Sequence, residues 1–131
     1  VAGCFMGSCA SVISVIVLCR LFGLDETMTA SLIPKSVTTP IAMELSAQGG
    51  GVPAFTVAAV IFTGILGAIT APLLVKLLRV KEPVEKGVAI GTCSHAIGTT
   101  KALEMGELEG AMSGISIGVA GIATVIICLF L

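Results

Sequence analysis

Three long stretches without a charged residue constrain this chain more than any other feature. They cover residues 1–19, 45–75 and 110–131. A helix needs about 20 apolar residues to cross the hydrocarbon core of a bilayer, so each stretch is long enough for one crossing. Only 11% of the residues are charged and the mean hydropathy is +1.12, whereas a soluble domain carries about 25% charged residues. We therefore predict an all-α, polytopic integral membrane protein.

The remaining composition argues against several other classes. The net charge is −1, and no basic run is interleaved with aromatic residues, so we expect no nucleic-acid partner. The five cysteines are odd in number and form no CxxC motif, which favours packing residues over disulfides or a metal site. Cys93 and Ser94 lie next to His95 but lack an orienting acid, so we expect no enzyme and no cofactor.

The segment KLLRVKEPVEK, residues 76–86, is the clearest loop. It carries four cations and the helix breaker Pro83. By the positive-inside rule it faces the cytoplasm, and the helix over residues 53–75 then runs from outside to inside. We expect the acidic segment EMGELEG, residues 104–110, on the opposite side, from which the final helix returns inward.

Two shorter and more polar elements lie between the long stretches, at residues 28–46 and 87–105. Pro34 and Pro40 interrupt the first element, and Gly91 and Gly98 loosen the second. Both have an apolar majority and can enter the membrane. We therefore predict about five membrane-embedded segments, two of them broken or re-entrant, in a single membrane domain over residues 1–131.

The two broken elements resemble each other. A shift of 61 residues places Thr38-Thr39 on Thr99-Thr100 and gives seven identities over residues 36–70. We interpret this similarity as an internal repeat whose unit is a broken element, a glycine linker and a long helix. The two units are parallel if both broken elements span the membrane, and inverted if one of them is re-entrant.

The breaks predict a polar pocket at membrane depth. Non-helical backbone in hydrocarbon is tolerated only where it is buried in protein or lines a watery cavity, and in transporters such breaks hold ions and small solutes. Thr39 before Pro40 is a good N-cap, and Thr100 takes the matching place before Lys101. We expect interruptions at residues 36–39 and 97–100 that meet in the membrane interior. The candidate residues for binding a small carboxylate are Lys35, Thr38, Thr39, His95, Thr99, Thr100 and Lys101.

Each of these residues also has a structural interpretation. The prolines can be simple kinks, and the threonines can bond back to their own helix. Lys35 and Glu44 can reach opposite membrane interfaces. Lys101 and Glu104, three residues apart, can neutralise each other. His95 is either a packing residue bonded to a backbone carbonyl or a group that takes part in transport or proton coupling.

Two motifs, PKSVTTP at residues 34–40 and SHAIGTTKALE at residues 94–104, resemble the LrgB/CidB family. The resemblance extends from about residue 32 to the end of the chain, and family members are roughly twice as long. It implies that the chain is the C-terminal half of a longer protein, an expectation that agrees with the absence of an initiator methionine at Val1. The implied location is the bacterial cytoplasmic membrane, or the plastid inner envelope in plant relatives.

The resemblance implies two functions. Bacterial members are described as holin/antiholin-like proteins that modulate murein hydrolase activity and autolysis with a small LrgA/CidA-type membrane partner. A plant plastid relative translocates glycolate and glycerate, and some bacterial pairs are associated with pyruvate uptake. Together with the polar pocket, this favours transport of a small carboxylate; antiholin-like modulation is the alternative. The expected partners are the lipid bilayer, the carboxylate, an LrgA/CidA-like protein and further copies of the chain.

Overall fold

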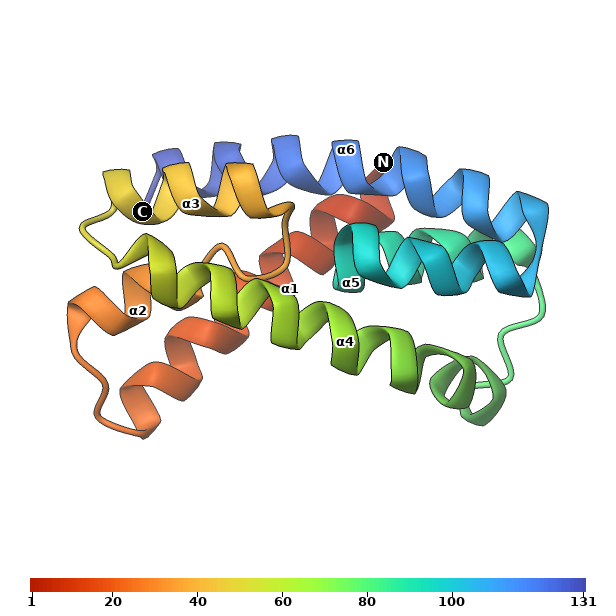
Figure 1. Cartoon of the computed structure of the whole chain (residues 1–131), viewed down its shortest axis with the longest axis horizontal. Helices are drawn as coiled ribbons and strands as arrows, with labels where there is room; N and C mark the ends of the chain where they lie inside the picture. Colours follow the sequence, from red (N-terminus) through yellow and green to blue (C-terminus); the bar gives the residue numbers. More distant parts are fainter.

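The computed structural model describes residues 1–131 and consists of helices joined by short turns (Figure 1). The helices α1, α4 and α6 are long and apolar enough to cross a membrane, and they correspond to the three uncharged stretches. The prediction of an all-α membrane protein is therefore confirmed at this level. The six helices are α1 (Ala2–Leu21), α2 (Glu26–Leu32), α3 (Thr39–Gln48), α4 (Pro53–Leu77), α5 (Pro83–Met105) and α6 (Glu107–Leu129).

Local sequence signals explain most helix boundaries. The Asp25 side chain caps α2 by accepting a 2.7 Å hydrogen bond from the Met28 amide. Pro53 and Pro83 open α4 and α5 at the first helical position, where a missing N–H costs nothing. Gly50, with φ of +77°, makes the turn between α3 and α4 in a conformation that favours glycine.

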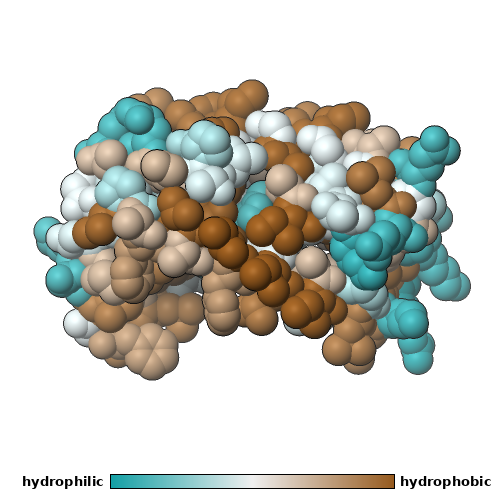
Figure 2. All heavy atoms as spheres, in the orientation of Figure 1, coloured by the Kyte–Doolittle hydropathy of each residue, from teal (hydrophilic) through white to brown (hydrophobic).

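Most charged residues gather at the two ends of the long axis. Figure 2 shows hydrophilic atoms at both ends and a largely hydrophobic band between them. The 25 residues of α4 and the 23 residues of α6 correspond to roughly 37 and 35 Å of helix, enough for a hydrocarbon core of about 30 Å. The long axis of the molecule is therefore the direction in which α4 and α6 can cross a bilayer.

The first predicted break is present between α2 and α3. Residues 33–38 are non-helical, and in Figure 1 the chain runs through them to the middle of the molecule before α3 runs back to the same end. We name α2, this turn and α3 the first hairpin. Thr38, rather than Thr39, is the N-cap residue of α3, so Pro40 stands at the second helical position. The predicted N-cap was wrong by one residue.

The second break is a single residue in the middle of α5. His95 has φ of 42° and ψ of −143°, which reverses the helix direction. Ile90 and Ala102 pack in one cluster with Ala71 of α4, although a straight helix would separate them by about 18 Å. Figure 1 shows the two arms, residues 83–94 and 96–105, side by side. We name them the second hairpin. The predicted interruption at residues 97–100 lies instead two residues earlier, because Gly98 and its neighbours are helical.

This reversal corrects the predicted position of the acidic segment. Lys86 and Glu109 form an ion pair of 3.9 Å, so the basic loop and the acidic turn lie at the same end of the molecule, not at opposite ends. The helix α6 therefore starts at the basic end. Figure 1 shows that α4 and α6 run in opposite directions along the long axis. Of the two orientations left open for the repeat, the geometry of the fold agrees with the inverted one.

Candidate functional site

The turn of the first hairpin places a cation near the middle of the molecule. Lys35 is half-buried, and its Nζ donates a hydrogen bond of 3.2 Å to the Ser36 hydroxyl. The Ser36 hydroxyl also pairs with the Ser11 hydroxyl of α1 at 2.8 Å. The two ion pairs of the structure involve Lys86 and Lys101, so Lys35 has no carboxylate partner. A half-buried cation without a counter-ion favours an anionic ligand.

The tip of the second hairpin is built around His95, which is 3% exposed. Its Nε2 lies 2.9 Å from the carbonyl oxygen of Val60 on α4. A carbonyl can only accept, so Nε2–H is the donor and Nδ1 is left as an acceptor. Gly64 makes room for the ring, because a Cβ there would lie 2.6 Å from His95 Cε1. A positive φ at a residue other than glycine is strained and is often found at functional sites.

Val60 connects the two tips. Its side chain packs against Val37 of the first hairpin, and its carbonyl accepts the hydrogen bond from His95 of the second. Lys35 lies within electrostatic range of both Cys93 and His95. Two segments about 60 residues apart in the sequence therefore meet at one place along α4, with a cation, an imidazole and several hydroxyls.

Thr92, one helical turn before His95, adds an unusual group to this region. It is 6% exposed, and its hydroxyl has no hydrogen-bond partner. Gly7 of α1 approaches it so closely that a Cβ would lie 2.7 Å from Thr92 Cγ2. A buried hydroxyl without a partner is costly and calls for a ligand, a water molecule or a rearrangement. The nearby Ser8 hydroxyl, by contrast, donates to the Ala120 carbonyl at 3.4 Å.

The structure separates the predicted site residues into two groups. Lys35 and His95 lie together at the tips. Thr38 and Thr39 start α3 beside them, half-buried, and the Thr38 hydroxyl makes no capping bond. The Thr99 hydroxyl is already hydrogen-bonded within the protein, because it donates to the His95 carbonyl at 3.0 Å and pairs with the Ser113 hydroxyl at 2.7 Å.

Thr100 and Lys101 lie outside this region. Thr100 is exposed within the second arm of α5 and does not cap a helix. Lys101 forms an ion pair with Glu104, which agrees with the structural interpretation of that lysine. The expectation that both breaks present threonines at helix starts is therefore wrong for the second break, because the turn at His95 comes before the Thr99-Thr100 pair.

Sequence reasoning missed three hydroxyl residues of this region: Ser11, Ser36 and Thr92. A usable signal was present in α1, where Ser8 and Ser11 are three residues apart and so share one face of an otherwise apolar helix. The region formed by Lys35, Ser11, Ser36, Thr92 and His95 is named the central polar cluster below. Its cation and hydroxyls can bind a small anion by charge-assisted hydrogen bonds.

Fold and site together define a polytopic membrane protein with two broken helical elements that meet inside it. The sequence model of the LrgB-like family matches residues 1–131, so the chain belongs to this family. It is 44% identical over 114 residues to the "Uncharacterized protein YxaC" of Bacillus subtilis (strain 168), an alignment that covers 87% of this chain and 50% of that protein.

A second relative carries a functional name. The chain is 42% identical over 122 residues to the "Antiholin-like protein LrgB" of Bacillus cereus (strain B4264), covering 93% of this chain and 53% of that protein. The same values hold for the protein of that name from Bacillus anthracis (strain CDC 684 / NRRL 3495). No solved structure matches the chain. The chain spans about half the length of the curated relatives it matches.

Proposed function

We propose that the chain is part of an antiholin-like membrane protein that modulates murein hydrolase activity and autolysis together with a small holin-like membrane partner. The observation that carries this proposal is the similarity, over 93% of the chain, to relatives named antiholin-like LrgB. The exposed apolar faces of α1 and α4 support it, since they provide surfaces on which further membrane helices can pack. Because the chain spans half of those relatives, the activity is proposed for the whole protein.

Expression of the full-length protein in a bacterium that lacks its own LrgB-like protein tests this proposal. We expect slower detergent-induced autolysis and weaker murein hydrolase activity, and we expect the effect to depend on co-expression of the small holin-like partner. An unchanged autolysis rate, with the protein present in the membrane in both strains, would contradict antiholin-like modulation.

The central polar cluster favours a second candidate function, the passage of a small carboxylate. The carrying observation is the unpaired Lys35 at the junction of two broken elements, within electrostatic range of His95. In this proposal Lys35 supplies the charge, and the Ser11 and Ser36 hydroxyls supply further hydrogen bonds. Thr38 and Thr39 lie at the start of α3, where helix N–H groups attract anions.

This candidate function includes a membrane placement. We propose that α1, α4 and α6 span the cytoplasmic membrane and that each hairpin enters from a different side, which gives five embedded segments. Residues 76–86 face the cytoplasm. The hairpin tips then meet near the middle of the bilayer, where backbone breaks are stable because they are buried in protein. Further copies of the chain complete the assembly in this proposal.

Flux into proteoliposomes separates the two candidate functions. A carboxylate transporter moves glycolate, glycerate or pyruvate across the membrane, alone or with its partner, whereas a pure modulator moves none of them. Lys35→Met should weaken carboxylate binding, and with it uptake at low substrate concentration, roughly tenfold or more, because a hydrogen bond to a charged group contributes about 1.5–3 kcal/mol. Uptake by Lys35→Met equal to that of the unmodified protein would remove the cluster from any transport pathway.

A further inference from the structure

We infer that the basic end of the molecule binds an anionic phospholipid, with the head group in a basic groove and an acyl chain in an adjoining apolar groove. The basic groove has a volume of about 430 Å³. Its cations come from the end of α4, the following turn and the start of α5. They are Lys76, Arg79, Lys81 and Lys86, and Pro72 and Met105 contribute hydrocarbon to the same groove.

The cations of this groove are only partly neutralised by the protein. Lys86 has a long ion pair of 3.9 Å with Glu109. Lys76, Arg79 and Lys81 take part in no ion pair, and the neighbouring acids Glu82 and Glu85 do not line the groove. At least three positive charges are therefore available to an anion at the level where the head groups of a bilayer lie.

The backbone of Arg79 provides a second, independent indication. The Arg79 and Val80 amides donate to the Lys76 and Val75 carbonyls, at 3.2 and 3.1 Å, which is the Schellman pattern that ends a helix. In this pattern the residue with positive φ is usually glycine, but here it is Arg79, with φ of 54°. An arginine at this strained position brings a cation to the groove at a cost in backbone energy, and strain of this kind is found at ligand sites.

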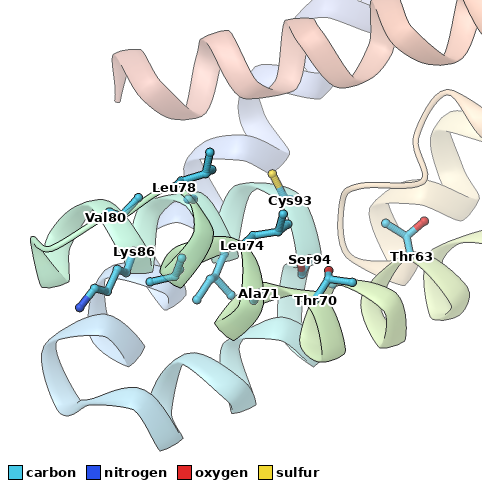
Figure 3. Close-up of a pocket in the computed structure, with 13 residues that line it drawn as sticks. Thr63, Thr70, Ala71, Leu74, Leu78, Val80, Lys86, Cys93 and Ser94 are labelled. Carbon is cyan, nitrogen blue, oxygen red and sulfur yellow. The ribbon is translucent and has the colours of Figure 1, made fainter.

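An apolar groove of about 350 Å³ continues from the basic one, and the two share Val75, Val80 and Lys86. It runs between α4 and the first arm of α5. Figure 3 shows Lys86 at one end and Thr63 at the other, with Leu74 and Ala71 between them. The sixteen residues from Thr63 to Leu78 extend over about 22 Å of helix, more than half the thickness of a hydrocarbon core of about 30 Å.

The two grooves together fit one amphiphile. A free phosphate would use the cations but leave the apolar groove empty. A neutral lipid would use the apolar groove but leave the cations unpaired. An anionic phospholipid satisfies both grooves at once, with its charge at the membrane surface and its chain directed toward the bilayer centre.

Thermal unfolding and native mass spectrometry of the purified full-length protein in neutral detergent test this inference. We expect dioleoyl phosphatidylglycerol to remain bound and to raise the unfolding temperature more than dioleoyl phosphatidylcholine at equal concentration. We expect soluble glycerol 3-phosphate to have no effect. Equal stabilisation by both lipids, retention of neither, or equal stabilisation by glycerol 3-phosphate would overturn the inference.

Variants of the basic groove separate the effect of the Arg79 charge on lipid binding from the effect of the Arg79 backbone conformation on stability. Arg79→Gly removes the cation and relieves the backbone, so the lipid-free protein should be at least as stable while its affinity for phosphatidylglycerol falls about fivefold, the effect expected of one cation near a membrane surface. Adding Lys81→Gln should lower the affinity by a further factor of similar size. Arg20→Gln, at the opposite end of the molecule, is the matched control and should change nothing. Full selectivity for phosphatidylglycerol in the double variant would contradict the proposed site.

A third variant tests the acyl groove. Ala89 is exposed and lines the apolar groove, so Ala89→Leu narrows the groove without disturbing the core. We expect this variant to bind dioleoyl phosphatidylglycerol severalfold more weakly than the unmodified protein does. An equal affinity of the variant and the unmodified protein for the dioleoyl form would place the acyl chain elsewhere.

Discussion

The two hairpins reach the same point of the molecule by different physical means. The first is fixed by hydrogen bonds between buried hydroxyls, because Ser31, Ser46 and Thr56 are all fully buried. The Thr56 hydroxyl bridges the Ser31 carbonyl at 2.9 Å and the Ser46 hydroxyl at 2.7 Å, which joins α2, α3 and α4. The second hairpin has hydrogen bonds from His95 and Thr99 but relies in addition on glycines at its contacts: Gly91 closely approaches the Ser113 backbone of α6, and Gly98 closely approaches Ser94 within its own hairpin.

This difference shows how a membrane protein can hold a broken helix in two ways. Hydrogen bonds satisfy the backbone and hydroxyl groups that a wide turn leaves free, so the first hairpin tolerates the six non-helical residues 33–38. Close packing on glycine leaves no space for an added methyl group in the second hairpin, which reverses at the single residue His95. The first hairpin should therefore lose stability when a hydroxyl is removed, and the second hairpin should lose stability when a methyl group is added.

The largest expected effect is on the glycine contacts. In Gly91→Ala the new Cβ would overlap the Ser113 carbonyl, and neither group can move without moving its backbone. We therefore expect the free energy of unfolding to fall by about 3 kcal/mol, or the variant not to fold. Gly114→Ala is the matched control, since no atom lies within 4 Å of its Cβ position; the replacement should stabilise α6 by up to about 1 kcal/mol. Unfolding in mixed micelles measures both, and equal stabilities of the two variants would refute the close packing of the second hairpin.

The next effect concerns the hydroxyl cluster of the first hairpin. Thr56→Val preserves the side-chain shape but leaves Ser31 and Ser46 without their shared partner, so we expect a loss of about 1–3 kcal/mol. In the control Thr70→Val, the lost hydroxyl bonds only to Leu66 of its own helix and is exposed, so the loss should stay below about 0.5 kcal/mol. The same unfolding measurement applies. If Thr56→Val lowers the free energy of unfolding no more than Thr70→Val does, the buried hydroxyls do not stabilise the first hairpin.

A smaller effect tests the turn at His95. In an ordinary helix alanine is more stable than glycine by about 1 kcal/mol. At positive φ the order reverses, because glycine adopts this conformation without strain. His95→Gly and His95→Ala lose the same hydrogen bond to Val60, so their difference isolates the backbone. We expect the glycine variant to be more stable by about 1 kcal/mol; the opposite order would mean that α5 is a continuous helix.

The smallest expected effect is at the ion pair of the second arm. Lys101 and Glu104 are both partly exposed, and a pair of this kind contributes about 0.5 kcal/mol or less. The double variant Lys101→Met with Glu104→Gln should therefore fold normally and retain whatever uptake the unmodified protein shows. Uptake lost in this folded double variant would return Lys101 to the binding site and contradict its placement outside the central polar cluster.

The sequence predicted the long helices and the first break well, because these depend on local signals. Uncharged length marks α1, α4 and α6, and the first break is marked by Pro34 within the non-helical turn and Pro40 at the start of α3. The place of the second break could not be predicted, because no proline marks it. His95 adopts its conformation through tertiary contacts, with Val60 and Gly64 of α4. The wrong side assigned to the acidic turn follows from the same cause.

The candidate site was predicted in part for similar reasons. Lys35 and His95 stand out because ionisable residues are rare in an apolar chain. Ser36 and Thr92 did not stand out, because hydroxyls are common in membrane helices and usually bond to their own backbone. Thr100 was included because the repeat placed it on Thr39, but the corresponding helix starts earlier in the second unit.

The sidedness of four turns tests the central claim most directly. In a cysteine-free background, single cysteines at Lys81, Glu107, Gly23 and Gly50 are labelled with a membrane-impermeant maleimide from either side of the membrane. The two hairpins predict that Lys81→Cys and Glu107→Cys react from one side, and that Gly23→Cys and Gly50→Cys react from the other. Reaction of positions 81 and 107 from opposite sides would show that α5 crosses the membrane and would contradict the account.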